Sequence, residues 1–232
     1  MNAAEAYHAV RQREGRVLVD EVVRGLPSSG VRTAHPEEWR VRERSLERVI
    51  GMFRDRPRVI LEAGCGNGWF SAGLAKAGHS VTGLDTGAVE LEQAKRVFAD
   101  RPMSWVLGDP WADGLPTRAF DVVLFAASVQ YFPDLPALVR RCRVLLKEGG
   151  EMLIVDSYFY TNDAAADQAN ARSAAYYAST GTPEMAAFYH HHTRKAVIDA
   201  CAGGLVEFIP PRGKAAALLL GRYPFPIVRI RP

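Results

Sequence analysis

The sequence predicts an α/β protein built on a doubly wound, mostly parallel seven-stranded sheet, with N-terminal helices and a helical lid insertion. Three observations support this prediction. Short apolar runs alternate with amphipathic helical patterns through the middle of the chain. A glycine-rich turn, residues 62–68, joins the first apolar run to a helix. The run 120–125 is almost continuously apolar, as expected for a parallel strand that is buried on both faces.

The composition fits one α/β domain with additions. The chain has 232 residues, 48% of them hydrophobic, and a net charge of +3. This length can bury a sizeable core, and so small a charge does not by itself indicate a nucleic-acid partner. The cysteines, Cys65, Cys142 and Cys201, are scattered and form no C-x-x-C motif, which predicts reduced thiols in a cytoplasmic protein. We expect neither a signal peptide nor a membrane span.

The first part of the chain, residues 1–55, reads as a helical segment. A helical pattern covers residues 3–24, and a break with proline, serine and glycine follows it. A second helix is predicted from Glu37 to about Met52, because a proline and acidic residues mark its first turn. Trp39 on this helix is a candidate pocket residue, although an aromatic anchor of the core is the commoner role.

Residues 56–156 carry the alternating pattern of the predicted core. Thr86 is a candidate N-cap for the second of its helices. We expect strands at 59–61, 81–84, 103–107, 120–125 and 151–155, and helices at 71–77, 88–99 and 135–146.

The rest of the chain is predicted to cover and complete this core. Residues 157–193 form an insertion rich in alanine, tyrosine and histidine, which we expect to lie over the cofactor mouth as a lid. Residues 194–232 are expected to supply a helix at 194–202 and an antiparallel pair of edge strands at 205–209 and 215–220. A proline-broken basic tail, residues 222–232, would follow.

The glycine turn indicates the kind of ligand. Gly64, Gly66 and Gly68 alternate, and Glu62 precedes the first of them by two residues. A carboxylate at this place would repel a pyrophosphate and suits an ammonium group, and the spacing differs from the G-x-G-x-x-G of NAD-binding proteins. Asp85 ends the next predicted strand, where a carboxylate can hold ribose hydroxyls. An amino acid joined to a nucleoside without phosphate fits both features, and S-adenosylmethionine (SAM) is such a molecule.

The order of the motifs resembles that of class I SAM-dependent methyltransferases of the type 11 or type 25 kind. The glycine turn and Gly83-Leu84-Asp85 are followed by Gly108-Asp109, by Phe120-Asp121-Val122-Val123 and by Leu145 to Gly150. The resemblance covers residues 59–156. It implies a Rossmann-like fold, SAM as cofactor and S-adenosylhomocysteine (SAH) as product.

The resemblance also implies a set of cofactor contacts. An acidic residue at the position of Asp109 contacts the adenine amino group in the family, and the side chains after it pack on the ring. The expected cofactor residues are Glu62, Gly64, Cys65, Gly66, Asn67, Gly68, Asp85, Thr86, Asp109, Pro110, Trp111, Ala126 and Ala127.

Acceptor residues are expected at the end of the fourth strand and in the lid. A general base helps methyl transfer to a hydroxyl or a protonated amine, and His190 or His191 is the candidate. Structural roles for these histidines remain open, and we expect no metal site because adjacent histidines lack further ligands at suitable spacing. The candidate acceptor contacts are Trp39, Gln130, Tyr131, Tyr158, Tyr160 and Tyr189.

The predicted function is methyl transfer from SAM to an O, N or C atom of a small molecule. One alternative is a nucleic-acid or protein methyltransferase, although a nucleic-acid partner is not favoured by the charge. A basic surface for it would come from Arg11, Arg13, Arg16, Arg24, Arg222, Arg229 and Arg231. Another alternative is a non-catalytic SAM-binding subunit. A monomer and a homodimer both fit the sequence.

Overall fold

In the computed structural model, which describes residues 2–28, 33, 35–210 and 225–232, the sheet has seven strands. Their order is β3-β2-β1-β4-β5-β7-β6. Strands β1 to β5 are parallel, and β7 is antiparallel to both of its neighbours. The strands are β1 Val59–Ala63, β2 Ser80–Asp85, β3 Met103–Leu107, β4 Phe120–Ala126, β5 Leu146–Val155, β6 Leu205–Ile209 and β7 Ile227–Arg231.

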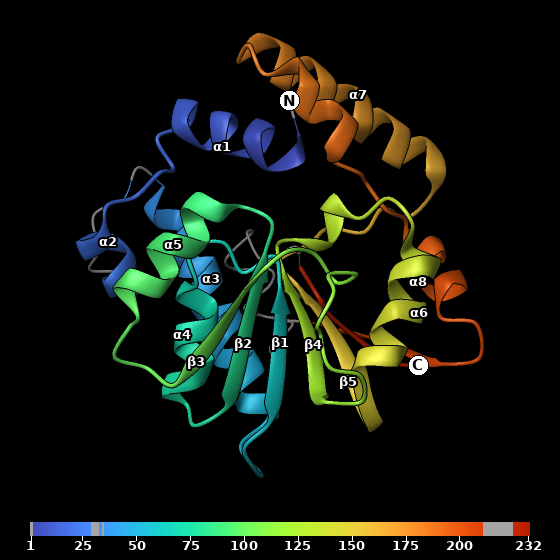
Figure 1. Ribbon diagram of the computed structural model, residues 1–232. Helices are drawn as coiled ribbons and strands as arrows, with labels where there is room; N and C mark the ends of the chain where they lie inside the picture. Colours follow the sequence, from blue (N-terminus) through green and yellow to red (C-terminus); the bar gives the residue numbers. More distant parts are fainter. Residues whose placement is uncertain (1, 29–32, 34, 211–224) are drawn as a thin grey trace.

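Helices cover both faces of this sheet (Figure 1). On one face, α6 and α8 pack on the sheet through Leu138, Leu145 and Val197. On the other face, α3 and α4 pack through Val49 and Phe70. The predicted doubly wound arrangement is therefore confirmed. The helices are α1 Ala3–Arg13, α2 Asp20–Gly25, α3 Pro36–Met52, α4 Trp69–Lys76, α5 Ala88–Val97, α6 Leu135–Leu145, α7 Asp163–Ser179 and α8 Arg194–Ala200, with 3-10 turns η1 Val129–Tyr131 and η2 Pro183–Phe188.

The N-terminal pattern forms two separate helices, where the sequence suggested one helical stretch. Asn2 and Glu5 form a capping box at the start of α1. The helix ends at Arg13, and Gly15 then adopts a φ of +64°, which a glycine reaches without steric cost. The chain thus turns after α1, so that α1 and α2 lie in different parts of the molecule (Figure 1).

The C-terminal strands correct the sequence prediction. The expected strand at 215–220 lies outside the described residues, and the last strand is β7, in the segment assigned to a basic tail. The Ile227, Val228 and Ile230 side chains of β7 are buried, which explains why this segment pairs between β5 and β6.

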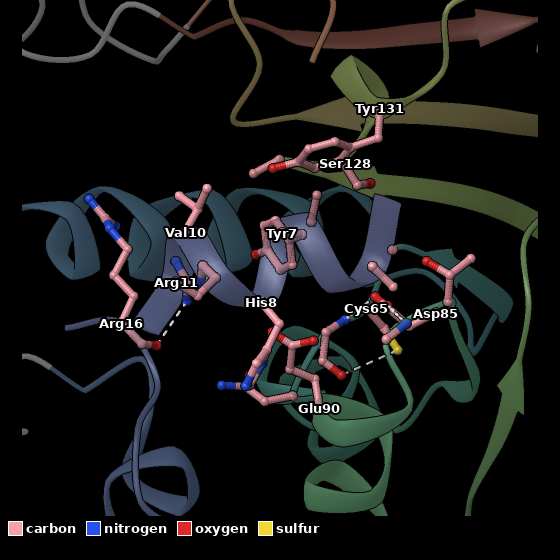
Figure 2. A pocket seen from close by; sticks show the side chains of 18 of the residues that line it. Tyr7, His8, Val10, Arg11, Arg16, Cys65, Asp85, Glu90, Ser128 and Tyr131 are labelled. Carbon is pink, nitrogen blue, oxygen red and sulfur yellow. Dashed lines mark hydrogen bonds between the residues drawn. The ribbon is translucent and has the colours of Figure 1, made fainter. Parts of the chain in front are cut away.

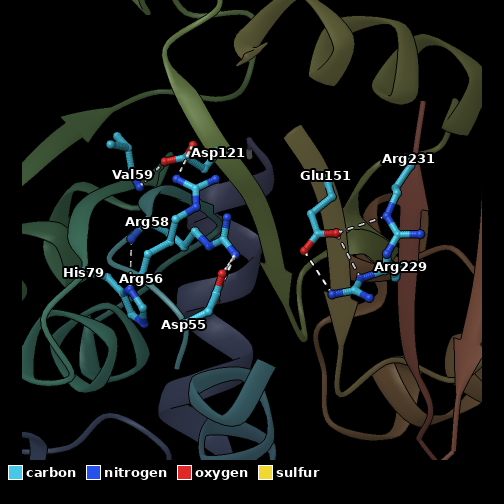
Figure 3. A network of polar contacts seen from close by, with 9 residues as sticks. All are labelled: Asp55, Arg56, Arg58, Val59, His79, Asp121, Glu151, Arg229 and Arg231. Carbon is cyan, nitrogen blue, oxygen red and sulfur yellow. Dashed lines mark hydrogen bonds and ion pairs between the residues drawn. The ribbon is translucent and has the colours of Figure 1, made fainter. Parts of the chain in front are cut away.

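Two arginines of β7 form ion pairs with acidic residues of the neighbouring strands β5 and β6 (Figure 3). Arg229 Nε lies 3.0 Å from a carboxylate oxygen of Glu151, and Arg231 Nε lies 3.6 Å from the same oxygen. Glu207 on β6 adds contacts at 3.7 and 3.6 Å to the same two arginines. Arg229 and Arg231 are therefore each paired with Glu151 and Glu207 of the neighbouring strands.

Asp121, part of the fourth-strand motif, lies where β4 begins and forms polar contacts with the neighbouring strands (Figure 3). Its Oδ2 accepts a hydrogen bond of 2.7 Å from the backbone N–H of Val59 and one of 3.2 Å from Lys147 Nζ. Arg56 lies 3.7 Å from the other carboxylate oxygen. Asp121 therefore joins β1, β4 and β5 at the edge opposite to the strand ends that carry ligands in such sheets.

A roof lies over the carboxyl ends of the strands (Figure 1). We call α1 together with α7 and the following residues to 191 the roof. Ala6 and Val10 of α1 pack with Tyr177 of α7 and Met185 of η2 in a small buried cluster. Arg13 Nη1 donates a 2.5 Å hydrogen bond to the carbonyl of Thr180. The insertion thus covers the sheet jointly with the N-terminal helix.

Within the described residues, no helix is long and apolar enough to cross a membrane.

Candidate active site

A cavity of about 1090 Å³ lies between the roof and the carboxyl ends of the strands. Figure 2 shows α1 crossing this cavity, with Tyr131 on one side and Glu90 on the other. Pockets for a single drug-sized ligand measure roughly 300–1,000 Å³. The cavity is therefore large enough to hold a cofactor and a second ligand together.

The three glycines of the turn differ in what surrounds them, and so in why a glycine is needed there. Gly64 has a φ of +77°, and a Cβ there would lie 2.5 Å from Cβ of Ser128. Gly68 has a φ of +76°, and a Cβ there would overlap the Trp105 ring. Gly66 also has a positive φ, yet among the described residues no atom beyond its chain neighbours lies within 4 Å of the position that a Cβ would take. Gly64 and Gly68 are thus required by packing, whereas Gly66 faces open space in the cavity.

Asp85 holds the glycine turn from the end of β2. Its Oδ2 accepts a 2.7 Å hydrogen bond from the N–H of Gly66, and its Oδ1 accepts one of 2.7 Å from the N–H of Gly87. Burial raises the pKa of Asp85, and these backbone donors oppose the rise. Asp85 also lines the cavity, next to the open face of Gly66.

Glu62 lies beneath the same turn, on β1. Its side chain is buried and accepts a hydrogen bond from the hydroxyl of Ser71 on α4. Burial raises the pKa of Glu62 to about 8. Glu62 also lines the cavity, so that a cationic group entering there would favour its charged form.

Most of the predicted cofactor residues lie together around this end of the cavity. Gly68 and Trp111 do not line it. Trp111 is 47% exposed and contacts the Phe132 ring at a centroid distance of 6.2 Å. Asp109 Oδ1 accepts a hydrogen bond of 2.8 Å from the N–H of Trp111. The predicted residues that line the cavity are Glu62, Gly64, Cys65, Gly66, Asn67, Asp85, Thr86, Asp109, Pro110, Ala126 and Ala127.

Two strand ends carry backbone strain at the cavity. Ala127 after β4 and Asp156 after β5 both have a φ of +53°, which costs energy for residues with a Cβ. Asp156 Oδ1 accepts a 2.5 Å hydrogen bond from Ser45 Oγ, and burial raises the pKa of Asp156 to about 6. Sequence reasoning did not assign Asp156 to the site. Its only sequence signal is a carboxylate directly after a strand.

The predicted acceptor residues divide between two cavities. Trp39, Gln130, Tyr131 and Tyr189 line the main cavity. Tyr158 and Tyr160 line a neighbouring cavity of about 210 Å³ instead. Gln130 and Tyr189 also line the smaller cavity, which therefore adjoins the main one beneath the roof.

The consecutive histidines have different environments. The backbone N–H of His190 donates a 2.8 Å hydrogen bond to the carbonyl of Gln130, and the His190 side chain lines only the smaller cavity. His191 lines both cavities, and its Nε2 lies 2.7 Å from Ser173 Oγ. Burial lowers the pKa of His190 and His191, and it lowers the pKa of His192 to about 4. All three imidazoles are therefore neutral near pH 7.

Four tyrosines gather under the roof. Tyr7 of α1 contacts Tyr131 edge to face at 5.5 Å between ring centroids. Tyr189 lies 5.6 Å from Tyr131 and 6.2 Å from Tyr177. Burial raises the pKa of each ring hydroxyl, so these groups remain protonated donors. Tyr7 was not among the predicted site residues, because no local pattern brings α1 to β4.

The fold and site define a class of protein. A doubly wound sheet, a glycine turn after β1 and a carboxylate at the end of β2 form a site for a nucleoside ligand outside the strand ends. The acidic residue before the glycines and the open surface at Gly66 fit a ligand without a pyrophosphate in that position.

Comparisons with known proteins agree with this class. Residues 61–154 match the family described as "Methyltransferase domain". The chain is 32% identical over 98 residues to an uncharacterized methyltransferase of Mycobacterium bovis, covering 42% of this chain and 50% of that protein. It is 34% identical over 110 residues to the ubiquinone biosynthesis O-methyltransferase of Proteus mirabilis, covering 46% of this chain and 43% of that protein. The chain thus spans about half the length of the curated relatives that it matches.

A solved structure extends the likeness beyond the sequence match. A SAM-dependent methyltransferase from Mesorhizobium loti superimposes with a TM-score of 0.59 at 20% identity, covering 83% of this chain and all of that chain. At this identity the likeness concerns the fold alone. Residues 61–154 are therefore similar to a methyltransferase domain, and the fold is that of the SAM-dependent methyltransferases.

Proposed function

We propose that this protein transfers a methyl group from SAM to a small-molecule acceptor bound under the roof. One observation carries the proposal: a continuous cavity of about 1090 Å³ reaches from the glycine turn to the tyrosines of the roof. Its volume exceeds that of most single-ligand pockets. Because the roof closes over it, an acceptor bound there would be a small molecule rather than a nucleic-acid duplex or a folded protein.

The residues at the glycine end suit each part of SAM. Gly66 leaves its backbone open to the amino-acid part, and Glu62 beneath it can offset the ammonium charge. Asp85 would accept hydrogen bonds from the ribose hydroxyls. Asp109, at the end of β3, would accept one from the adenine amino group. The cavity lining and the order of the strands support these placements.

The bound cofactor would supply an activated methyl group, so the chain's own task is positioning and exclusion of water. Methyl transfer needs the acceptor atom in line and about 3 Å away. The roof covers the cavity, and Gln130 and Tyr131 of η1, shortly after the end of β4, line it. These features favour catalysis in which the protein holds the acceptor atom close to the methyl group and in line with it.

His191 is the best-placed candidate for a general base. Its imidazole is neutral near pH 7 because burial lowers its pKa, and it lines the main cavity. Ser173 Oγ, 2.7 Å from Nε2, can fix the ring orientation. His190 is a weaker candidate because it lines the smaller cavity only. A base is needed where the acceptor is a hydroxyl or a protonated amine.

The direct test uses SAM labelled in its methyl group. We would incubate the protein with an extract of small metabolites, with total RNA and with total protein in separate reactions. Label should enter the small-molecule fraction, and Asp85→Ala should lower the incorporation when the concentration of SAM is below its Kd. Label in RNA or protein alone would contradict a small-molecule acceptor. SAM binding without transfer to any fraction would support the non-catalytic alternative instead.

A further inference from the structure

The smaller cavity lies away from the glycine turn. It measures about 210 Å³, which is below the roughly 300–1,000 Å³ of a pocket for a whole drug-sized ligand. Among the described residues, none from the glycine turn or from β1, β2 and β3 lines it. Its border with the main cavity includes Gln130, Asp156, Tyr189 and His191. The smaller cavity therefore has room for one group of an acceptor that reaches across this border.

Asp156 presents one free carboxylate oxygen at the border. The residue follows β5 directly, and its Oδ1 accepts the hydrogen bond of 2.5 Å from Ser45 Oγ on α3. Within the described residues, Oδ2 accepts no hydrogen bond, and it is not among the buried polar atoms that lack a partner. Oδ2 is therefore accessible from the cavity. Ser45 thus holds the carboxylate in place and leaves one oxygen for a ligand.

The negative charge of Asp156 is only partly compensated. Arg42 and Arg48 of α3 act on it at longer range. In the part of the chain that the structure describes, Asp156 forms no ion pair within 4.0 Å. Burial raises the pKa of Asp156 to about 6 in spite of both arginines. The carboxylate is therefore mostly ionised at pH 7, and a cation bound beside it would stabilise the charged form.

Aromatic rings surround the smaller cavity next to this carboxylate. The centroid of the Tyr160 ring lies 4.8 Å from that of Tyr158 and 5.4 Å from that of His191. The Tyr189 ring follows at 5.1 Å from the His191 ring. The face of an aromatic ring attracts a cation, and several rings around one carboxylate form a suitable environment for an ammonium group.

The other groups of the smaller cavity do not repel a cation. Among the described residues that line it, there is no lysine or arginine. Its histidines are neutral near pH 7, because burial lowers the pKa of His190 and His191 and lowers that of His192 to about 4. An anionic group would thus meet Asp156 with no counter-charge in this lining, whereas a cationic group would meet a carboxylate and aromatic rings.

We propose that the acceptor bears an ammonium group, which occupies the smaller cavity, where Asp156 binds it as an ion pair and the rings of Tyr160 and Tyr189 flank it. The rest of the acceptor would extend across the border into the main cavity, toward the methyl group of the cofactor. The ammonium group anchors the acceptor, whichever of its atoms receives the methyl group. This inference rests on the proposed function and names the chemical class of its acceptor.

The test measures binding of matched probes to the protein saturated with SAH, so that the cofactor's own ammonium group is already bound. Benzylamine, phenethylamine and tryptamine would each be titrated by calorimetry against benzyl alcohol, 2-phenylethanol and tryptophol, respectively. Each alcohol keeps the shape of its amine and lacks the charge. A charged hydrogen-bonded pair should make at least one amine bind about ten- to a hundredfold more tightly than its alcohol.

Asp156→Asn is the matched variant. Asparagine tolerates the φ of +53° and can still accept the hydrogen bond from Ser45, so the substitution removes the charge with little change of shape. It should remove the preference for the amine. Glu148→Gln is the control, because it removes the same charge from an exposed position near the start of β5 and should leave the preference intact.

The affinity for SAH separates the possible failures. Asp156→Asn should bind SAH as the unaltered protein does, which also shows that the variant is folded. If Asp156→Asn loses affinity for SAH as strongly as for the amines, Asp156 contacts the cofactor, and the inference is wrong. The absence of a preference for any of the amines in the unaltered protein would also overturn it, while SAH binding would leave the proposed function standing. Failure of the unaltered protein to bind SAH would instead refute the proposed function itself.

Discussion

The two ends of the cavity are built in different ways. At the cofactor end, residues close in sequence form the site, since Glu62, Gly64 and Gly66 belong to one turn and Asp85 to the next strand. At the roof end, α1 and α7 meet although about 160 residues separate them. The cofactor end depends on backbone geometry, whereas the roof depends on side-chain packing. Substitutions that change backbone conformation should therefore disturb the cofactor end most. Substitutions that change side-chain volume should disturb the roof most.

The largest effect is expected for Gly64→Ala. Its Cβ would lie 2.5 Å from Cβ of Ser128 at a φ of +77°, so strain and overpacking together should cost about 2–5 kcal/mol. Thermal unfolding would show this as a large fall in Tm. Gly66→Ala is the matched control, because it also strains the backbone, at a φ of +52°, but its Cβ meets open space. This variant should lose SAH affinity and should be destabilised less than Gly64→Ala. Equal destabilisation by both substitutions would contradict the different roles of the two glycines.

The stability of the roof should depend on the volume of its buried side chains. Met185 is buried between α1 and α7, and Met185→Ala should weaken the roof by about 2 kcal/mol, the low end for such a change because the cluster is small. Hydrogen exchange should become faster in α1 while the strands remain protected, since local opening needs only the roof contacts to break. Faster exchange throughout β1 and β4 would mean that the roof is not a separate unit.

Asp85→Ala should weaken binding of SAM and SAH by about 1–3 kcal/mol, because the ribose hydroxyls lose a charged acceptor. Calorimetry with SAH measures the change. Asp109→Ala is a useful companion, because Asp109 lies at the adenine end and does not hold the glycine turn. Unchanged affinity in Asp85→Ala would remove Asp85 from the cofactor site.

Glu62 should make the cofactor end sensitive to pH. Its pKa in the folded protein, about 8, lies above the value of about 4.5 for an unfolded glutamate. The buried acid therefore contributes stability below about pH 4.5, and this contribution is lost as pH rises through 8. Glu62→Gln should flatten the decline between pH 5 and 8, as followed by chemical unfolding at several pH values. If the stability of Glu62→Gln falls with pH as steeply as that of the unaltered protein, the decline comes from Glu90 or Asp156 instead.

The smallest effect is expected at Trp111. Its side chain is about half exposed and lies outside the cavity lining, so Trp111→Ala should change SAH affinity by less than about 0.5 kcal/mol. A titration with SAH would check this. A clear loss of affinity would show that the loop after β3 rearranges on binding and brings Trp111 onto the adenine.

The same contrast explains what the sequence could predict. The parallel strands, the glycine turn and the acidic end of β2 follow from apolar runs and residue spacing, because each depends on a few neighbouring residues. The place of Tyr7 in the site depends on how distant helices pack, which periodicity does not encode. The last strand was misplaced because Pro224 and Pro226 suggest a tail, although Ile227, Val228 and Ile230 carry the alternation of a buried strand.

The most direct test of the central claim is a calorimetric titration of the unaltered protein with SAM, SAH and NAD in turn. The account predicts one site for SAM and SAH and none for NAD. At about a hundred times its Kd, SAH should stabilise the fold by about 2.7 kcal/mol. Binding of NAD with no response to SAM or SAH would contradict the account, because the glycine turn and Asp85 would then serve a different cofactor.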